Sequence, residues 1–229
     1  MGGGGIQRTT LIVNLDNSSA AAQLAIENNY QNQVCFHLNL SEGIPLTDDI
    51  KRTGMCNASG SFRWAKWKRI HATCVTPYAI RAIRKEVEAQ MKLFREMGFH
   101  STHLDSHDWI LFNYPVWCAV KPLLNKYGFV TTRMACENWI RNERLPLRLY
   151  HKWMTGVIKK HLKMDTDWAG GFRSFEKAVK RGLIHKDTSL EVMTHPEIVN
   201  GLLADTSSHK CFNIRDEIKS LLSKVEMIQ

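Results

Sequence analysis

The sequence lacks the features that mark membrane, secreted and disulfide-stabilised proteins. No apolar run approaches the roughly 18 residues of a membrane span, and the first residues lack the charged and apolar regions of a secretory signal. No two cysteines form a C-x-x-C pair, which excludes zinc-ribbon spacing. The six cysteines are Cys35, Cys56, Cys74, Cys118, Cys136 and Cys211. We therefore expect a soluble, cytoplasmic chain without membrane contact and with reduced cysteines.

The sequence also lacks long runs of one charge, although its net charge is +9 and its pI is about 9.3. The densest basic stretch, residues 64–69, is short, and no recognised nucleic-acid motif is present. A nucleic-acid-binding protein is suggested by charge alone, and it would show affinity that falls steeply with salt. We favour a solvated basic surface and predict no nucleic-acid partner.

The chain shows neither internal repeats nor a linker between domains. Its 229 residues suffice for one sizeable core, and 44% hydrophobic and 23% charged residues argue against disorder. We predict a single domain over residues 1–229, preceded by a glycine-rich start at residues 1–5 without ordered structure.

Strand and helix patterns alternate along the chain. Strands are predicted over residues 9–15, 33–40, 101–107, 129–134 and 190–194, from β-branched and alternating apolar residues. Helices are predicted over residues 20–28, 77–97, 115–127 and 214–227, with Pro122 delaying or kinking the third. This order is typical of an α/β fold with a parallel sheet or a (β/α) barrel. In such folds the functional site lies at the carboxyl ends of the strands.

Three histidines, His37, His107 and His195, stand at or near the ends of predicted strands. A single histidine on a strand is commonly structural or solvated. Three of them in one α/β domain also fit a site for a divalent metal such as zinc, which is usually completed by a carboxylate.

Three motifs around these histidines resemble one family. Residues 36–46 read F-H-L-N-L-S-E-G-I-P-L, which is similar to the G-x-H-x-N-L-S/T-E-G-x-P signature of the YdjC-like deacetylases. Residues 102–107 read T-H-L-D-S-H, and residues 191–196 read E-V-M-T-H-P. They resemble that family's T-H-x-D-S-H and E-x-M-x-H-P motifs, in the family's order. The resemblance extends from about residue 6 to about residue 222.

The resemblance implies a distorted (β/α) TIM-like barrel and a carbohydrate deacetylase that acts on chitooligosaccharides. It implies a divalent metal cofactor, Mg or Zn, with His37 and His107 as metal ligands. Asp105 would shape the site and His195 would act as general acid toward the leaving amine. The substrate-binding residues implied by the resemblance are Arg133, Asn39 and Glu42.

The chain departs from the family at its start. The family opens with a strand ending in N-A-D-D-F-G, whose aspartates supply a base and a metal ligand. Asp16 and Asn17 can be set on that motif, but only 20 residues separate Asn17 from His37 (37 − 17), far fewer than in the family. Residues 5–14 instead resemble the family's next strand. We therefore expect that the first strand and its helix are missing, which exposes sheet edges. Strand exchange in a homodimer would restore them.

Two functions follow as expectations. The first is a metal-dependent hydrolase that removes acetyl groups from N-acetylated sugars or oligosaccharides. The alternative is a catalytically impaired or inactive relative that binds sugars or serves as a scaffold, because the aspartate segment is not found.

Overall fold

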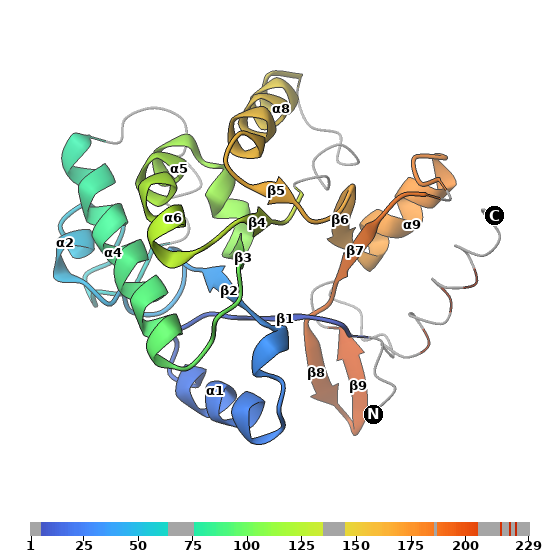
Figure 1. Cartoon of the computed structure of the whole chain (residues 1–229), viewed down its shortest axis with the longest axis horizontal. Helices are drawn as coiled ribbons and strands as arrows, with labels where there is room; N and C mark the ends of the chain where they lie inside the picture. Colours follow the sequence, from blue (N-terminus) through green and yellow to red (C-terminus); the bar gives the residue numbers. More distant parts are fainter. Residues whose placement is uncertain are drawn as a thin grey trace. The chain divides into compact units, whose positions relative to one another are not determined.

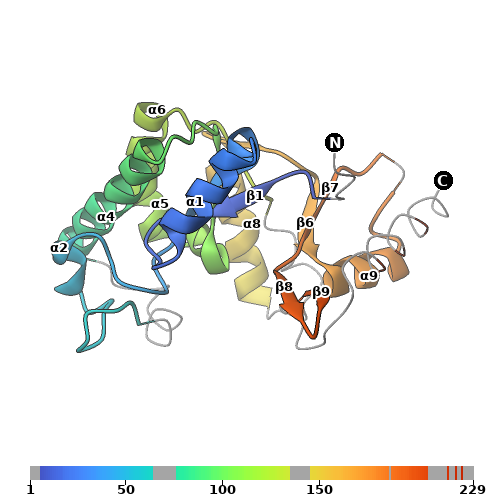
Figure 2. The same ribbon diagram turned by 90° about the horizontal axis from the view of Figure 1, so that it is seen from below.

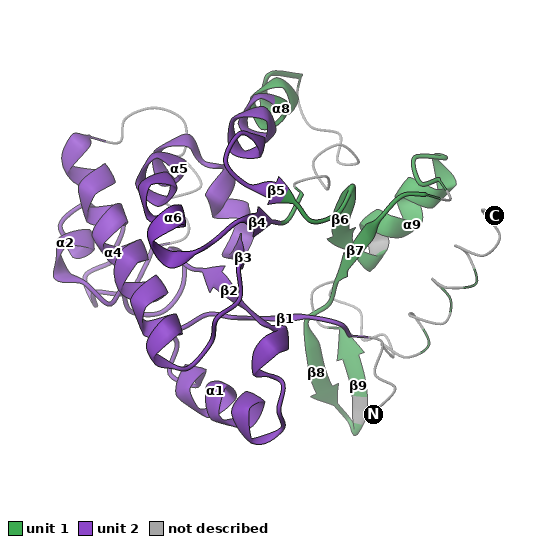
Figure 3. Cartoon of the chain, viewed as in Figure 1, with its two compact units in different colours: residues 1–5, 133–152, 164–229 green, residues 6–132, 153–163 purple. Residues whose placement is uncertain are grey.

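The computed structural model describes residues 6–63, 76–134, 145–185 and 187–205, together with residues 216, 220 and 223. Contacts between Cα atoms divide the chain into two compact units, coloured in Figure 3. Unit 2 comprises residues 6–132 and 153–163, and unit 1 comprises residues 1–5, 133–152 and 164–229. Each unit is described by itself, and the single domain over residues 1–229 stays a prediction. The glycine-rich start at residues 1–5 and the basic stretch at residues 64–69 lie outside the described residues. Of the helix predicted over residues 214–227, the structure describes only residues 216, 220 and 223, each of them helical.

A five-stranded sheet organises unit 2, in the order β1-β2-β3-β4-β5. Its strands are β1 (Thr9–Leu11), β2 (Val34–Leu38), β3 (His103–Ser106), β4 (Thr131–Thr132) and β5 (Lys163–Met164). The pairs β1–β2, β2–β3 and β3–β4 are parallel. Strands placed side by side in chain order are the arrangement of a (β/α) barrel, whereas a doubly wound sheet reverses direction at a switch point. The predicted α/β class is therefore confirmed, and β1 is the outer strand of this sheet.

An aromatic cluster forms the centre of the unit 2 core. The ring of Phe36 lies 5.4 Å from Phe94 and 5.5 Å from Phe129, measured between centroids, and all three side chains are buried. Four of the five β2 residues are buried, which is typical of a strand covered on both faces. Figure 1 shows α4 (Pro77–Glu96), α5 (Tyr114–Val120) and α6 (Leu124–Tyr127) on the same side of strands β2 to β4.

The helix α4 follows the predicted pattern closely. Ile83, Val87, Met91 and Phe94 repeat at helical spacing and are fully buried. The helix begins with Pro77, after Thr76, whose Oγ1 accepts a hydrogen bond from Ala79 N at 3.2 Å. After the helix, Gly98 takes φ +90°, a conformation open to glycine.

Replacing Thr76 by alanine is expected to lower the free energy of unfolding by about 1 kcal/mol, because it removes the side-chain cap of α4. Urea denaturation followed by circular dichroism measures this difference. The variant Thr76→Ser keeps the hydroxyl and serves as the control. Equal losses in both variants would contradict a capping role.

The remaining elements of unit 2 are short. They comprise α1 (Ser18–Glu27), η1 (Gln31–Gln33), α2 (Asp48–Lys51), η2 (His107–Phe112), η3 (Lys121–Leu123) and the end of α8 (Leu145–Lys159). The helix predicted over residues 115–127 divides into α5, η3 and α6 around Pro122, which confirms the predicted kink. The strand predicted over residues 9–15 shortens to β1.

Arg95 ties the strand starts of unit 2 together. Its guanidinium donates to Phe99 O at 2.9 Å, to Ser101 O at 3.1 Å and to Tyr127 O. It also lies 4.8 Å from the ring centroid of Phe129. Burial lowers the pKa of Arg95 from its usual value. The three carbonyl contacts give this charge the partners that a partly buried cation needs.

Unit 1 contains a parallel pair of strands and a hairpin. The strands β6 (Trp168–Gly171) and β7 (Leu190–Met193) flank α9 (Phe172–Lys180), and β8 (Pro196–Val199) pairs with β9 (Leu202–Asp205) in antiparallel fashion. Figure 2 shows both arrangements. Its core comprises Trp168, Phe172, Phe175, Ala178 and Ile184. The strand predicted over residues 190–194 corresponds to β7. The hairpin was not predicted, although Asn200 and Gly201, with φ 50° and 78°, form an Asn-Gly turn.

None of the helices in the part of the chain that the structure describes is long and apolar enough to cross a membrane.

Candidate functional site

The predicted site residues fall into both units. Unit 2 carries His37 in β2, Asp105 in β3 and His107 at the start of η2. Asn39 and Glu42 lie in the loop that follows β2. Unit 1 carries Arg133 and His195, which are described below with their own neighbours.

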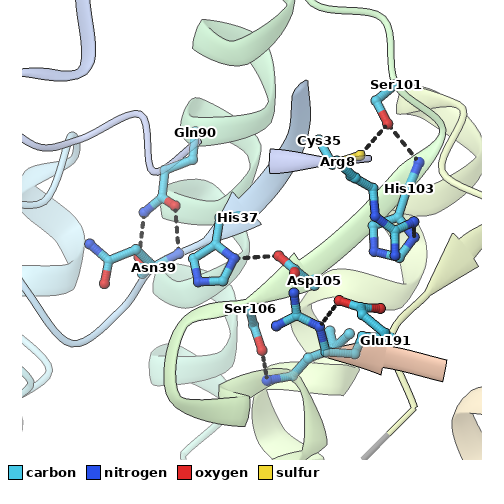
Figure 4. A network of polar contacts seen from close by, with 12 residues as sticks. Arg8, Cys35, His37, Asn39, Gln90, Ser101, His103, Asp105, Ser106 and Glu191 are labelled. Carbon is cyan, nitrogen blue, oxygen red and sulfur yellow. Dashed lines mark hydrogen bonds and ion pairs between the residues drawn. The ribbon is translucent and has the colours of Figure 1, made fainter. Parts of the chain in front are cut away.

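The register of the sheet brings His37 and Asp105 together. They are Cα partners in the β2–β3 ladder, so their side chains leave the sheet on the same side. His37 Nδ1 contacts Asp105 Oδ1, and the carboxylate is only 2% exposed (Figure 4). Because a carboxylate accepts and does not donate, Nδ1 is the protonated nitrogen of His37. The opposite nitrogen, Nε2, is thereby left with a lone pair for a ligand.

His107 lies next to His37 and faces two carboxylates. The ring centroids of the two histidines are 5.7 Å apart. His107 Nε2 is 3.2 Å from Glu42 Oε1 and 3.2 Å from Asp108 Oδ2. Asp108 and Trp109 take φ values of 52° and 60°, a left-handed conformation that is costly for residues with a side chain. This strained turn directs the Asp108 carboxylate toward His107.

Asn39 organises the loop that carries Glu42. Its side chain is fully buried. Its Oδ1 accepts from Ser41 N and Glu42 N, both at 3.1 Å, and its Nδ2 donates to Glu42 O at 2.8 Å and to Asn14 Oδ1 at 2.9 Å. These contacts account for both ends of the amide. A substrate contact for Asn39 stays a prediction.

His103, the first histidine of the second motif, is buried in β3. Its Nδ1 lies 3.2 Å from Arg8 Nη1 and 3.1 Å from Thr131 Oγ1. These contacts link β3 to β4 and to the segment before β1. They support a structural role for His103, which the sequence left open.

The two predicted site residues of unit 1 each meet a carboxylate. Arg133 Nε donates to Glu191 Oε1 at 2.6 Å, with both side chains largely buried. The backbone N–H of His195 donates to Asp205 Oδ1 at 3.4 Å, and Asp205 is 1% exposed. Sequence reasoning gave no role to Glu191 or Asp205. The glutamate of the third motif was the available signal for Glu191, whereas nothing in the sequence pointed to Asp205.

The donors around His107 match a divalent cation in chemical type. Imidazole nitrogens and carboxylate oxygens are ligands that zinc accepts, and a carboxylate behind His37 is common for metal-ligating histidines. Within the described residues, however, no three His, Cys, Asp or Glu side chains are grouped closely enough to hold a metal ion. A cation at this place therefore requires the contact of His107 with Glu42 and Asp108 to rearrange around it.

Comparison with known proteins decides the family. The model of the family described as YdjC-like protein matches residues 2–225. The chain belongs to the YdjC-like family. This match confirms the resemblance drawn from the three motifs.

Curated relatives in this family carry the name carbohydrate deacetylase. The protein of Oceanobacillus iheyensis is 24% identical over 96% of this chain and 86% of its own length. That of Clostridium beijerinckii is 26% identical over 98% of this chain and 82% of its own length. The zebrafish (Danio rerio) protein is 29% identical, but the match spans 60% of this chain and 44% of that protein.

One solved structure shares the fold. It is described as a cellobiose-phosphate cleavage protein of Enterococcus faecalis, and it matches with a TM-score of 0.62 at 15% identity. The match covers 97% of this chain and 79% of that one.

Proposed function

We propose that this YdjC-like chain is a metal-dependent carbohydrate deacetylase, which hydrolyses the acetamido group of an N-acetylated sugar or oligosaccharide. The observation that carries the proposal is the His37–Asp105 pair beside His107, formed by two family motifs at the carboxyl ends of β2 and β3. The names of the curated relatives support the same chemistry. The cytoplasmic location, the homodimer and the lack of a nucleic-acid partner stay predictions.

The reaction needs an activated water, a polarised acetyl carbonyl and a proton for the departing nitrogen. A bound divalent cation, Mg or Zn, supplies the first two. His37 Nε2 and His107 would hold the cation. Asp105 would keep the proton of His37 on Nδ1, so that Nε2 stays available as a ligand.

Other residues of the chain would handle the proton and the substrate. His195 has an imidazole, whose ordinary pKa suits proton donation near neutral pH, and would protonate the amine as the C–N bond breaks. Arg133, held by Glu191, would contact the sugar or the acetate product. Glu42 and Asn39 would contact the sugar from the loop after β2.

Metal removal tests this proposal. Purified chain is treated with a chelator and then given Mg²⁺ or Zn²⁺, and acetate release from N-acetylglucosamine and its oligomers is measured. Release that disappears with the chelator and returns with one metal is the expected result. Release that is indifferent to the chelator would contradict metal dependence. Sugar binding without any release would favour the alternative, a non-catalytic relative.

A further inference from the structure

A buried glutamate on α4 holds the loop that follows β2. Glu86 is 0% exposed, and its Oε2 accepts from Thr47 N and Thr47 Oγ1, both at 2.8 Å. Its Oε1 accepts from Leu46 N at 3.0 Å. An isolated buried carboxylate is costly, and hydrogen bonds are what make burial tolerable. Glu86 thus depends on residues 46–47 being in place, and these residues depend on Glu86.

The neighbour of Glu86 on the same helix face extends this contact toward the site. Gln90 is also 0% exposed, and its Nε2 donates to Glu86 Oε1 at 2.9 Å and to Asn39 O at 2.7 Å. Its Oε1 accepts from Asn39 N at 3.2 Å. Because the Glu86 carboxylate only accepts, it fixes which end of the Gln90 amide faces Asn39. Figure 4 shows Gln90 bound to the backbone of Asn39 through both ends of its amide.

The contacts of Asn39 carry this order to Glu42 and from there to His107. The Asn39 amide binds both the N–H and the carbonyl of Glu42, at 3.1 and 2.8 Å. The backbone of Glu42 is therefore fixed, while its side chain remains 55% exposed and reaches His107 Nε2 at 3.2 Å. An unbroken series of printed contacts thus joins a core residue of α4 to the imidazole of His107.

We propose that Glu86 is a positioning residue for the candidate site, which orders the segment from Asn39 to Thr47 and so keeps Glu42 opposite His107. The inference rests on the proposed function only insofar as Glu42 and His107 take part in the reaction. A residue needed for core stability alone would not require a charge, because a buried ionic group can often be replaced by apolar residues at little cost. All hydrogen-bond partners found for the Glu86 carboxylate, Gln90 apart, belong to this loop.

The first test is amide hydrogen exchange in the variant Glu86→Gln. An amide NH₂ in place of a carboxylate oxygen must oppose some of the donors around it, so the Leu46 and Thr47 N–H groups should exchange about 10- to 100-fold faster. The control is Glu88→Gln, also on α4, which loses only an exposed contact with Lys126. The milder variant Thr47→Val deletes one donor to Glu86 and should shift exchange of Leu46 in the same direction, even if Glu86→Gln folds poorly. Unchanged exchange in Thr47→Val and Glu86→Gln would overturn the inference.

The second test is a double-mutant cycle on acetate release. If Glu86 acts through Glu42, Glu86→Gln lowers kcat/KM by about tenfold in the native background and has no further effect in a Glu42→Gln background. Additive losses would show a purely structural role and overturn the inference. A native chain that releases no acetate would overturn the proposed function, and the exchange experiment would then decide the role of Glu86 alone.

Discussion

The variant His37→Ala is expected to bind a divalent cation more than about 100-fold more weakly than the native chain, since removing a partner behind a ligand already costs about 10- to 100-fold. The physical reason is the arrangement around this residue. Asp105, 2% exposed, contacts Nδ1 and leaves Nε2 as the ligand atom. Alanine removes that atom and leaves a buried carboxylate without its imidazole.

Isothermal titration with Zn²⁺ measures this affinity without reference to catalysis. The matched control is His100→Ala, which removes an exposed histidine of the same unit. Acetate release should fall with the affinity of His37→Ala and stay unchanged in His100→Ala. Equal zinc affinity of His37→Ala and the native chain would contradict a metal site at His37, whatever the activity of the variant.

The variant Phe36→Ala is expected to lose about 3–5 kcal/mol of unfolding free energy, the usual cost of truncating a buried aromatic residue to alanine. Phe36 is 0% exposed and lies between Phe94 and Phe129. Its removal leaves a cavity between α4 and β2 that the surrounding rings cannot fill without strain. Because native domains have a net stability of about 5–15 kcal/mol, this single change is a large fraction of the total.

Urea denaturation measures the loss, with Leu24→Ala as the control. Leu24 lies on α1 and is 60% exposed, so its truncation should change stability by no more than about 0.5 kcal/mol. Similar losses in both variants would show that the aromatic cluster is not the centre of the core. Phe36 is also the residue before His37, so a weaker core should loosen the site as well.

The local elements with strong periodic signals could be predicted from the sequence. The helix α4 was predicted from Thr76, Pro77 and the buried apolar residues at helical spacing, because these signals act within one or two turns. The strand β2 was predicted from a short alternating run of apolar residues. The family was recognised from three motifs, since the residue types within each motif are local properties of the chain. The predicted strands that became very short, such as β4, are cases where apolar residues alone overstated the ladder.

Only the tertiary structure decided which side chains meet. His37 and Asp105 are 68 positions apart, and the parallel register of β2 and β3 places them opposite each other. Glu86 and Gln90 look like ordinary polar residues of an amphipathic helix. Packing buries both of them against a loop some 40 to 51 positions away. The sequence determined the residue types and the local elements, because propensity and spacing are local. Strand register and helix packing decided the partners, because contacts between distant segments depend on the burial of the whole core.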